Sequence, residues 1–346
     1  MNSAKPNVSV VVPAFNAEAT LPACLAALGR MSYPATEIIV FSDGSTDRTA
    51  EIAEASGARV ICGEAYPRGP AYARNVAARE AASPLLLFVD ADVVISEDCL
   101  KVLVKELVER QVAAVFGSYD CRPASTRVAG LYANLRHHLT HQNSAREAST
   151  FWSGLGLIER HVFFEMGGYD AKKFAHPSIE DVELGIRLKN AGYRIRLVPE
   201  AQAKHCKDWT LWRLWHTDVV RRALPWSRLL LEGKTDGADL NVSSAERVKA
   251  LTSVAIFLAL VVSIFEPLAL LSALAFLILY LILNRRFIRL LAQNLTTSQW
   301  LRATLLHLCY HTYSLVVYAG VAGGKALLTV LSAIKKQRDR QSHHVG

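Results

Sequence analysis

The stretch LLLFVDADVVI, residues 85–95, decides the fold because an uninterrupted apolar run leads directly into two carboxylates. Leu85 to Val89 has the continuous apolar character of a strand in a parallel sheet that helices cover on both faces. A buried strand does not end on Asp90 and Asp92 unless something there compensates for the desolvation of their charges. The stretch therefore predicts a buried sheet with a ligand at its edge.

Three similar β-rich runs precede this strand, and stretches with helical spacing separate the runs. The predicted strands are residues 8–12, 37–41, 58–62 and 85–89, and the predicted helices are residues 19–28, 46–56 and 71–82. This alternation predicts an α/β fold with a Rossmann-like, doubly wound, mostly parallel sheet. Ligands of such sheets bind beyond the carboxyl ends of the strands, where Phe15, Asp43, Asp90 and Asp92 fall. A strand at 113–118 and a helix at 180–190 follow.

Composition divides the chain into four parts. We expect a catalytic α/β domain at 1–205, an amphipathic interfacial segment at 206–248, transmembrane or membrane-associated helices at 249–334 and a basic polar tail at 335–346. In the interfacial segment, Trp209, Trp212 and Trp215 recur every three residues between arginines, a pattern typical of a helix in the headgroup layer.

Residues 250–283 are almost wholly apolar, and only Glu266-Pro267 interrupts them. One helix of that length would measure about 51 Å, whereas a bilayer core is about 30 Å thick. We therefore expect a hairpin of two short spans that returns Arg285 and Arg286 to the cytoplasmic side. The apolar stretch 303–322 leaves three readings open: a third span, a re-entrant or interfacial segment, or a fold-back at Gly320 to Gly324.

The start of the chain has no cleavable apolar run behind a charged segment, so the N-terminal part is expected in the cytoplasm and the whole chain in the inner (plasma) membrane as a multi-pass protein. The formal charge is +8, and much of the excess lies beside apolar segments. Anionic lipid is therefore a simpler partner than nucleic acid. The six cysteines form no CxxC pair, which indicates thiols in a reducing compartment.

Asp90 and Asp92 stand at positions i and i+2, so on extended chain both side chains point to one side. Mg²⁺ and Mn²⁺ take one or two protein carboxylates and complete their shell with water and substrate phosphates. An isolated D-x-D is more often a solvated turn. This pair directly follows a buried strand and shares its sheet edge with other candidates, which favours a metal site.

Other side chains at the same edge suit a nucleotide. Phe15 can stack on a flat base, although a lone aromatic is more often a core residue. Asp43 can accept from a base N–H, although polar residues at a helix start explain part of its segment. Arg74, on a helix entered through Gly69-Pro70, can reach a diphosphate.

The ordered set VSVVVPAFN, SDGSTD, GPAYARN, DAD, GGYD (167–170) and EDVELGIRLKNAGYRI (180–195) resembles the family 2 glycosyltransferases with the GT-A fold. The likeness covers about residues 8–205. It implies a nucleotide-diphosphate sugar donor, either a UDP- or a GDP-sugar, a divalent metal (Mn²⁺ or Mg²⁺) and inversion at the anomeric carbon. The chain departs from the family pattern at Ser42, where relatives more often carry aspartate, and it lacks the QxxRW of processive synthases.

The resemblance also implies roles for particular residues. Phe15 and Asp43 resemble the base-binding residues, Asp90 and Asp92 the D-x-D that meets ribose and metal, and Asp181, with Glu180 beside it, the acceptor base. Pro13, Arg74 and Gly154 are the remaining expected donor contacts, and His205 is a further candidate metal ligand. A lone histidine is more often structural. His137, His138 and His141 have helical metal-site spacing but no acidic partner nearby, so a polar helix or loop is favoured over zinc.

These residues favour an inverting, metal-dependent glycosyltransferase acting on a lipid-linked or membrane-associated acceptor in glycan or glycolipid synthesis. Transfer to a polyprenyl phosphate is the alternative within this class, because an anionic nucleophile needs no base at Asp181. A non-catalytic membrane scaffold that binds a sugar nucleotide is the alternative from another class. A nucleotidyltransferase is a weaker enzyme alternative, because the glycine-rich phosphate loop is missing after the first strand.

Overall fold

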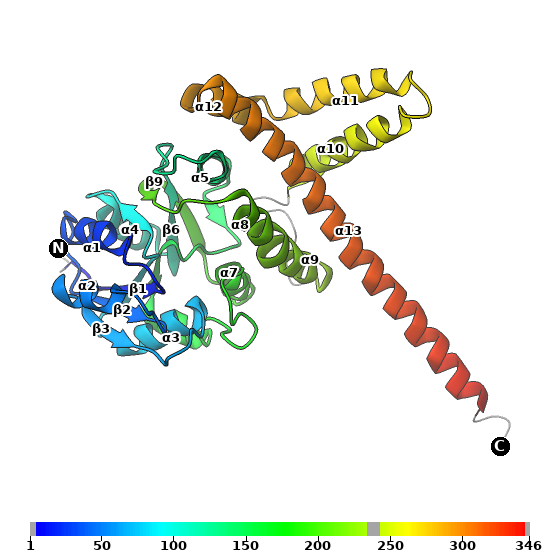
Figure 1. The fold of residues 1–346 in the computed structure, drawn as a ribbon. Helices are drawn as coiled ribbons and strands as arrows, with labels where there is room; N and C mark the ends of the chain where they lie inside the picture. Colours follow the sequence, from blue (N-terminus) through cyan, green and yellow to red (C-terminus); the bar gives the residue numbers. More distant parts are fainter. Residues whose placement is uncertain (1–4, 234–242, 343–346) are drawn as a thin grey trace. The chain divides into compact units, whose positions relative to one another are not determined.

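The computed structural model describes residues 5–233 and 243–342, and the chain there falls into two compact units (Figure 1). The sheet unit comprises residues 5–214 and 286–304. The helical unit comprises residues 215–233, 243–285 and 305–342. Residues 234–242 of the expected interfacial segment, and the side chains of the expected basic tail, lie outside what the structure describes.

The sheet unit is built on one mixed sheet. Its described strands are β1 (Val8–Ala14), β2 (Glu37–Ser42), β3 (Arg59–Cys62), β4 (Leu85–Val89), β5 (Val93–Ile95), β6 (Ala114–Tyr119), β7 (Glu147–Ala148), β8 (Leu155–Glu159) and β9 (Ile195–His205). The strand order is β3-β2-β1-β4-β8-β6-β9-β5, and β7 pairs with β9. The first four strands in this order are parallel to one another, whereas β8 runs antiparallel between β4 and β6.

Helices cover both faces of the parallel half, as the sequence predicts. The helices of this unit are α1 (Leu21–Gly29), α2 (Thr49–Ala55), α3 (Pro70–Glu80), α4 (Cys99–Arg110), α5 (Val128–Asn143), α6 (Arg160–Glu165) and α7 (Glu180–Asn190). Alternate residues of β1 and β4 share one buried cluster with the apolar faces of α1 and α4. All five side chains of β4 are buried, which confirms its reading as a central strand.

The structure adds a return of the chain that the sequence did not indicate. After the helical hairpin, α12 (Arg285–Asn294) and the first residues of α13 (Thr297–Ser342) rejoin the sheet unit. Phe287 and Leu291 of α12 are buried, and the Phe287 ring lies 5.9 Å from the ring of Tyr132 on α5. Segment 286–304, expected among the membrane helices, therefore belongs to the sheet unit.

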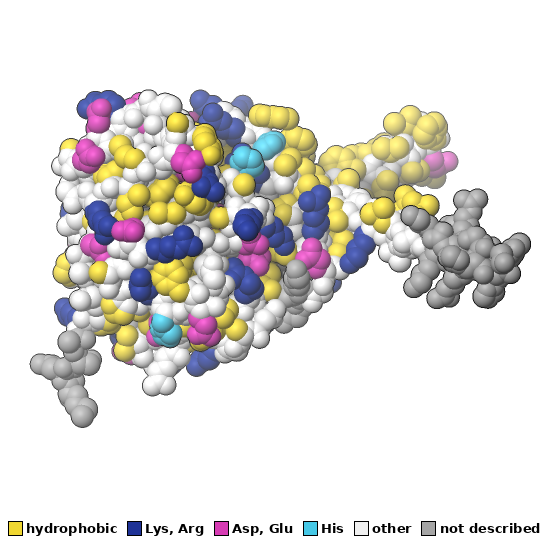
Figure 2. Space-filling view, turned by 90° about the horizontal axis from the view of Figure 1, so that it is seen from below, with side chains coloured by type: hydrophobic (Ala, Val, Ile, Leu, Met, Phe, Trp, Pro, Cys, Tyr) yellow, Lys and Arg dark blue, Asp and Glu magenta, His cyan; other side chains and the backbone are white. Residues whose placement is uncertain are grey.

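The helical unit carries the apolar hairpin. Its described elements are η1 (Thr217–Ala223), α9 (Leu224–Leu231), α10 (Ser244–Val262), α11 (Ala269–Leu283) and the larger part of α13, while α8 (Leu211–His216) bridges from the sheet unit. Helices α10 and α11 pack on each other, and the break between them contains Glu266-Pro267. The helical hairpin is therefore confirmed, while its crossing of a membrane as two short spans stays a prediction. In Figure 2 hydrophobic side chains dominate the visible surface of this hairpin, whereas charges of both signs are spread over the sheet unit.

Among the described helices, one is long and apolar enough to cross a membrane, at Thr297–Thr329. The pair Ala269–Leu283 and Arg285–Asn294, bent by 72°, would be a second candidate if it counts as one span. Helix α13 continues through Gly320 and Gly324, so the fold-back considered for this stretch is wrong. The three tryptophans expected on one interfacial helix differ in position and exposure. Trp209 is buried and precedes α8, while Trp212 and Trp215 lie on α8 and are exposed.

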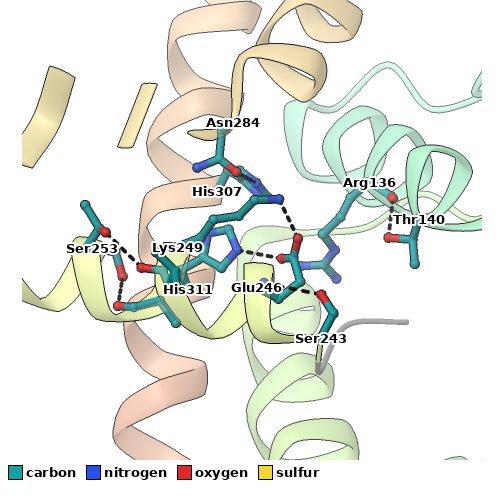
Figure 3. A network of polar contacts seen from close by, with 12 residues as sticks. Arg136, Thr140, Ser243, Glu246, Lys249, Ser253, Asn284, His307 and His311 are labelled. Carbon is teal, nitrogen blue, oxygen red and sulfur yellow. Dashed lines mark hydrogen bonds and ion pairs between the residues drawn. The ribbon is translucent and has the colours of Figure 1, made fainter. Parts of the chain in front are cut away.

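A seam of buried polar side chains joins the helices of the helical unit (Figure 3). His311 of α13 lies between Glu246 of α10, at 3.0 Å, and the Tyr280 hydroxyl of α11, at 2.8 Å. One turn earlier, His307 pairs with the Asn284 side chain at 3.1 Å. Polar pairs of this kind fix which helix faces meet, because apolar helix surfaces have little preference among partners.

Candidate active site

The polar residues predicted at the carboxyl ends of the strands do lie at one edge of the sheet. Phe15 follows β1, Asp43 follows β2 and Asp90 follows β4, and these three strands are neighbours and parallel. Phe15 is 51% exposed as a residue, so it lies outside the core and is available to a flat ligand. Pro13 stays within β1, opposite Phe41 of β2.

Arg74 joins the two acidic motifs. Its guanidinium lies 2.5 Å from Asp90 and 3.1 Å from Glu180, and the arginine is almost fully buried. Burial opposes its charge, but Asp90, with further contributions from Tyr169 and Glu180, outweighs burial and raises the pKa of Arg74. Asp90 and Glu180, far apart in sequence, thus form one charged cluster. The expected diphosphate contact of Arg74 stays a prediction, and the structure shows its guanidinium paired with these two carboxylates.

Asp43 fixes the segment that brings Arg74 to the site. Its carboxylate accepts hydrogen bonds from the backbone N–H groups of Arg68 and Gly69, at 2.7–3.1 Å, directly before α3 begins. Gly69 has a φ of +92°, and a Cβ there would lie 2.3 Å from the Ala175 carbonyl oxygen. Only glycine fits this close approach. Asp43 is buried, and the hydrogen-bond donors described for it are backbone amides. A hydrogen bond from a base N–H would come in addition to these.

Asp92 points to a different partner from Asp90. The antiparallel pairing of β5 with β9 sets Val93 opposite His205, and Asp92 lies 3.7 Å from the His205 ring and 3.8 Å from the Lys207 ammonium. Burial alone would raise its pKa, but His205 and Lys207 outweigh burial and hold the pKa of Asp92 well below its usual range. The Tyr119 ring stacks on His205 at 4.5 Å.

The predicted metal ligands are thus only partly brought together. Asp92 and His205 are neighbours, while Asp90 turns to Arg74. Within residues 5–233 and 243–342, no group of three or more His, Cys, Asp or Glu side chains is placed to hold a metal. One carboxylate and one imidazole nevertheless fit Mn²⁺, which accepts both donor types and completes its shell with water and phosphate oxygens.

Asp181 sits at the start of α7 with both carboxylate oxygens engaged. Oδ2 accepts from the backbone N–H of Ser153 at 3.1 Å and from its hydroxyl at 3.3 Å, and Oδ1 accepts from the N–H of Val182 at 2.8 Å. Burial and the neighbouring charge of Glu180 raise the pKa of Asp181 to about 6. Its ionised form is therefore a stronger base than an ordinary aspartate.

The turn Trp152-Ser153-Gly154 connects all the parts of the site. Ser153 holds Asp181, and the Gly154 carbonyl accepts from the Asp90 N–H at 3.3 Å. The Trp152 ring packs against Tyr119, 4.7 Å away, and against His137, 4.8 Å away. A Cβ on Gly154 would lie 2.6 Å from the Trp152 ring, so the indole itself requires glycine there.

Sequence reasoning missed four of these residues: Tyr119, Trp152, Ser153 and Lys207. The sequence contains no spacing that marks them, because the side chains that they contact lie far away along the chain. The histidines that the sequence placed on a polar helix or loop lie on the helix α5: His138 pairs with the Tyr119 carbonyl and His141 with the Gly117 carbonyl. Burial lowers the pKa of His141 to about 4.

Comparison with known proteins was made with this geometry in hand. Residues 9–167 match the family described as "Glycosyl transferase family 2". The chain is 28% identical over 240 residues to the probable glycosyltransferase YdaM of Bacillus subtilis, covering 64% of this chain and 55% of YdaM. It is 28% identical over 115 residues to the UDP-Glc:alpha-D-GlcNAc-diphosphoundecaprenol beta-1,3-glucosyltransferase WfgD of Escherichia coli, covering 33% of this chain and 46% of WfgD. The chain thus spans about half the length of these relatives.

A solved structure is similar over nearly the whole chain. The mannosyltransferase PcManGT from Pyrobaculum calidifontis, in complex with GDP-Man and Mn²⁺, matches with a TM-score of 0.57 and 20% identity. The match covers 92% of this chain and 88% of that one. At this identity the likeness establishes the GT-A fold, in agreement with the fold class that the sequence predicts.

Proposed function

Since the chain carries a family 2 glycosyltransferase domain, we propose that it transfers a sugar, with inversion and with the help of a divalent metal, from a nucleotide-diphosphate donor to a lipid-linked acceptor. One observation carries the proposal. Arg74 binds Asp90 and Glu180 together, and therefore holds the D-x-D segment and the acidic start of α7 in a single site.

The donor end of this site lies at the carboxyl ends of β1, β2 and β4. The exposed Phe15 ring would stack on the base, Asp43 would accept from it beside the amides it already binds, and Pro13 and Gly154 would shape the backbone around the donor. WfgD is named for UDP-Glc, and PcManGT is described with GDP-Man. A UDP- or GDP-sugar is accordingly the donor that we propose.

Asp92, with His205 beside it, would hold Mn²⁺ or Mg²⁺, and Asp90 would remain with Arg74 near the ribose. When bound, such a cation supplies positive charge to the departing diphosphate. Asp92 suits a cation, because its low pKa keeps the carboxylate ionised at any physiological pH. Mn²⁺ is part of the described PcManGT complex, which supports a divalent ion.

Asp181 is the proposed base, and Glu180 supports it through Arg74. A hydroxyl acceptor must lose a proton as it attacks, and a carboxylate with a pKa of about 6 is ionised at neutral pH yet basic enough to take that proton. Attack on the face opposite the diphosphate inverts the anomeric carbon. We expect the rate to fall as the pH drops through about 6, because protonation removes the base.

The proposed acceptor is lipid-linked, and the proposed location is the cytoplasmic face of a plasma membrane, with more than one membrane pass. WfgD is named for a diphosphoundecaprenol acceptor, and this chain carries an apolar hairpin and a candidate span at Thr297–Thr329. Transfer to a polyprenyl phosphate, and sugar-nucleotide binding without catalysis, are the alternatives that the experiment below distinguishes.

The test uses the full-length protein in detergent with a panel of UDP- and GDP-sugars, with and without Mn²⁺. We expect release of nucleoside diphosphate from at least one donor, a loss of about 100-fold or more in Asp92→Asn, and a similar loss in Asp181→Asn on a lipid-linked hydroxyl acceptor. Full activity of Asp181→Asn on a polyprenyl phosphate alone would indicate the phosphate acceptor. Binding of donors without any release would refute the enzyme.

A further inference from the structure

Ser153 has a role in the site that neither its residue type nor its neighbours in sequence indicate. It precedes β8, is almost fully buried, and directs both of its donors at one atom. Its N–H lies 3.1 Å and its hydroxyl 3.3 Å from Oδ2 of Asp181. A buried serine usually satisfies its hydroxyl on a nearby backbone carbonyl, whereas this one reaches across to a carboxylate on another element.

The two oxygens of Asp181 are consequently unequal. An ionised carboxylate oxygen offers about two acceptor positions. In the described part of the chain Oδ2 accepts two hydrogen bonds, both from Ser153, and Oδ1 accepts one, from the Val182 N–H. One position on Oδ1 is therefore left for a third donor.

We propose that Ser153 is a positioning residue that saturates Oδ2 of Asp181 and orients the carboxylate so that Oδ1 receives the proton of the acceptor. This inference rests on the proposed glycosyl transfer. The acceptor O–H bond breaks and its proton passes to Oδ1. The electron pair left on the acceptor oxygen forms the new bond to the anomeric carbon, and the bond from that carbon to the diphosphate breaks, with its electrons leaving on the nucleoside diphosphate.

The titratable groups around Asp181 come from its own helix and from two further elements. Glu180 precedes it on α7, Arg74 approaches from α3, and Tyr169 lies in the loop after α6. Glu180 disfavours the ionised carboxylate and Arg74 favours it. Hydrogen bonds to a carboxylate favour its charged form, so loss of the Ser153 hydroxyl should make Asp181 harder to ionise.

Ser153→Ala removes the hydroxyl and keeps the N–H. With the donor that the wild-type protein uses fastest and a lipid-linked hydroxyl acceptor, we expect kcat to fall about tenfold and the acid limb of the kcat–pH profile to move up by about half a pH unit. KM for the sugar-nucleotide donor should stay within about twofold, because the Ser153 hydroxyl contacts Asp181, the proposed catalytic base, and not the side chains proposed to bind the sugar nucleotide. Ser153→Cys keeps a side chain of similar size with a weaker hydrogen-bond donor, so its kcat and its acid limb should lie between those of the wild type and Ser153→Ala.

Ser83→Ala is the matched control, since Ser83 is equally buried and lies at the other end of β4. It should keep the wild-type pH profile. A fall in kcat without movement of the acid limb, in Ser153→Ala or in Ser153→Cys if the alanine variant does not fold, would assign Ser153 a purely structural role and overturn the inference. A wild-type protein that releases no diphosphate from any donor would instead refute the proposed function itself.

Discussion

Arg74 shows how one buried side chain can join two acidic segments of a site. A buried cation flanked by Asp90 and Glu180 is stable only while all three charges are present, because removing one leaves the others uncompensated in a poorly solvated place. The sequence suggested a phosphate contact for this arginine. It could not show burial, because Glu180 of α7 meets Arg74 only in the folded chain.

Replacement of Arg74 should therefore affect stability as well as activity. We expect Arg74→Ala to lower the free energy of unfolding by about 2–4 kcal/mol, because the buried Glu180 and the partly exposed Asp90 lose their shared cation. Chemical denaturation in detergent measures this. Arg79→Ala removes an exposed arginine from the same helix and should change stability by less than about 0.5 kcal/mol. Equal effects of the two substitutions would contradict the structural role of Arg74.

Some of the other site residues could be predicted from the sequence pattern around them, and some could not. Asp90, Asp92 and Asp181 could be predicted because each follows a strand or begins a helix that periodicity reveals. The pairing of Asp92 with His205 was only one of two readings, since it depends on β5 meeting β9 across the sheet. Ser153 could not be found at all, because its partner lies on another element.

Helix α7 places Asp181, and it does so by packing closely on the segment before Trp152. A Cβ on Gly185 would lie 2.2 Å from the backbone N of Phe151 and 2.5 Å from backbone atoms of Thr150. Any larger residue must push α7 away from the turn that holds its catalytic end. The sequence contains this glycine in a helical stretch, but only the packing explains it.

Gly185→Ala should consequently reduce stability and activity together. We expect a loss of about 1–3 kcal/mol from the forced displacement of α7, and a fall in diphosphate release because Asp181 moves away from Ser153. Thermal unfolding and the donor assay measure the two effects. Gly29→Ala is the control, because nothing lies within 4 Å of a Cβ at that position. Wild-type behaviour of Gly185→Ala would show that α7 tolerates the shift.

The sheet itself was only half predictable. Continuous apolar runs identified β1, β2, β3 and β4, and parallel pairing follows from the helices between them. The antiparallel insertion of β8 was not predicted, since its residues carry no signal of strand direction. Strand β9 contains Pro199, which cannot donate to a ladder, and the β6–β9 register shifts in the same region.

At the scale of the whole chain, composition predicted the apolar hairpin but not the return of the chain to the sheet unit. Phe287 and Leu291 look like any residues of an amphipathic helix, and their burial depends on Tyr132 and the surrounding surface of α5. The expected boundary at 205 follows the end of the motifs. The compact unit extends to 214 and then regains 286–304.

A chain that ends at Leu214 should therefore be an incomplete domain. Without 286–304 the ring of Tyr132 loses the cover of Phe287, and we expect the truncated protein to unfold at a temperature lower by about 5 °C or more, or to aggregate. Thermal unfolding against the full-length protein measures this. Phe265→Ala in the full-length protein, at an 84% exposed position, should leave the transition unchanged. A truncated chain as stable as the full-length protein would contradict the role of α12.

The return of α12 also constrains how the polypeptide can thread a bilayer. Residues up to 214 and residues 286–304 belong to one compact unit, and we expect a unit built on an open mixed sheet to lie on one side of any bilayer that the chain enters. The number of crossings between them must then be even, so α10 and α11 both traverse the bilayer or neither does. If α13 then crosses the bilayer once, the C-terminus lies on the face opposite the sheet unit. The side of the C-terminus therefore depends only on whether α13 crosses.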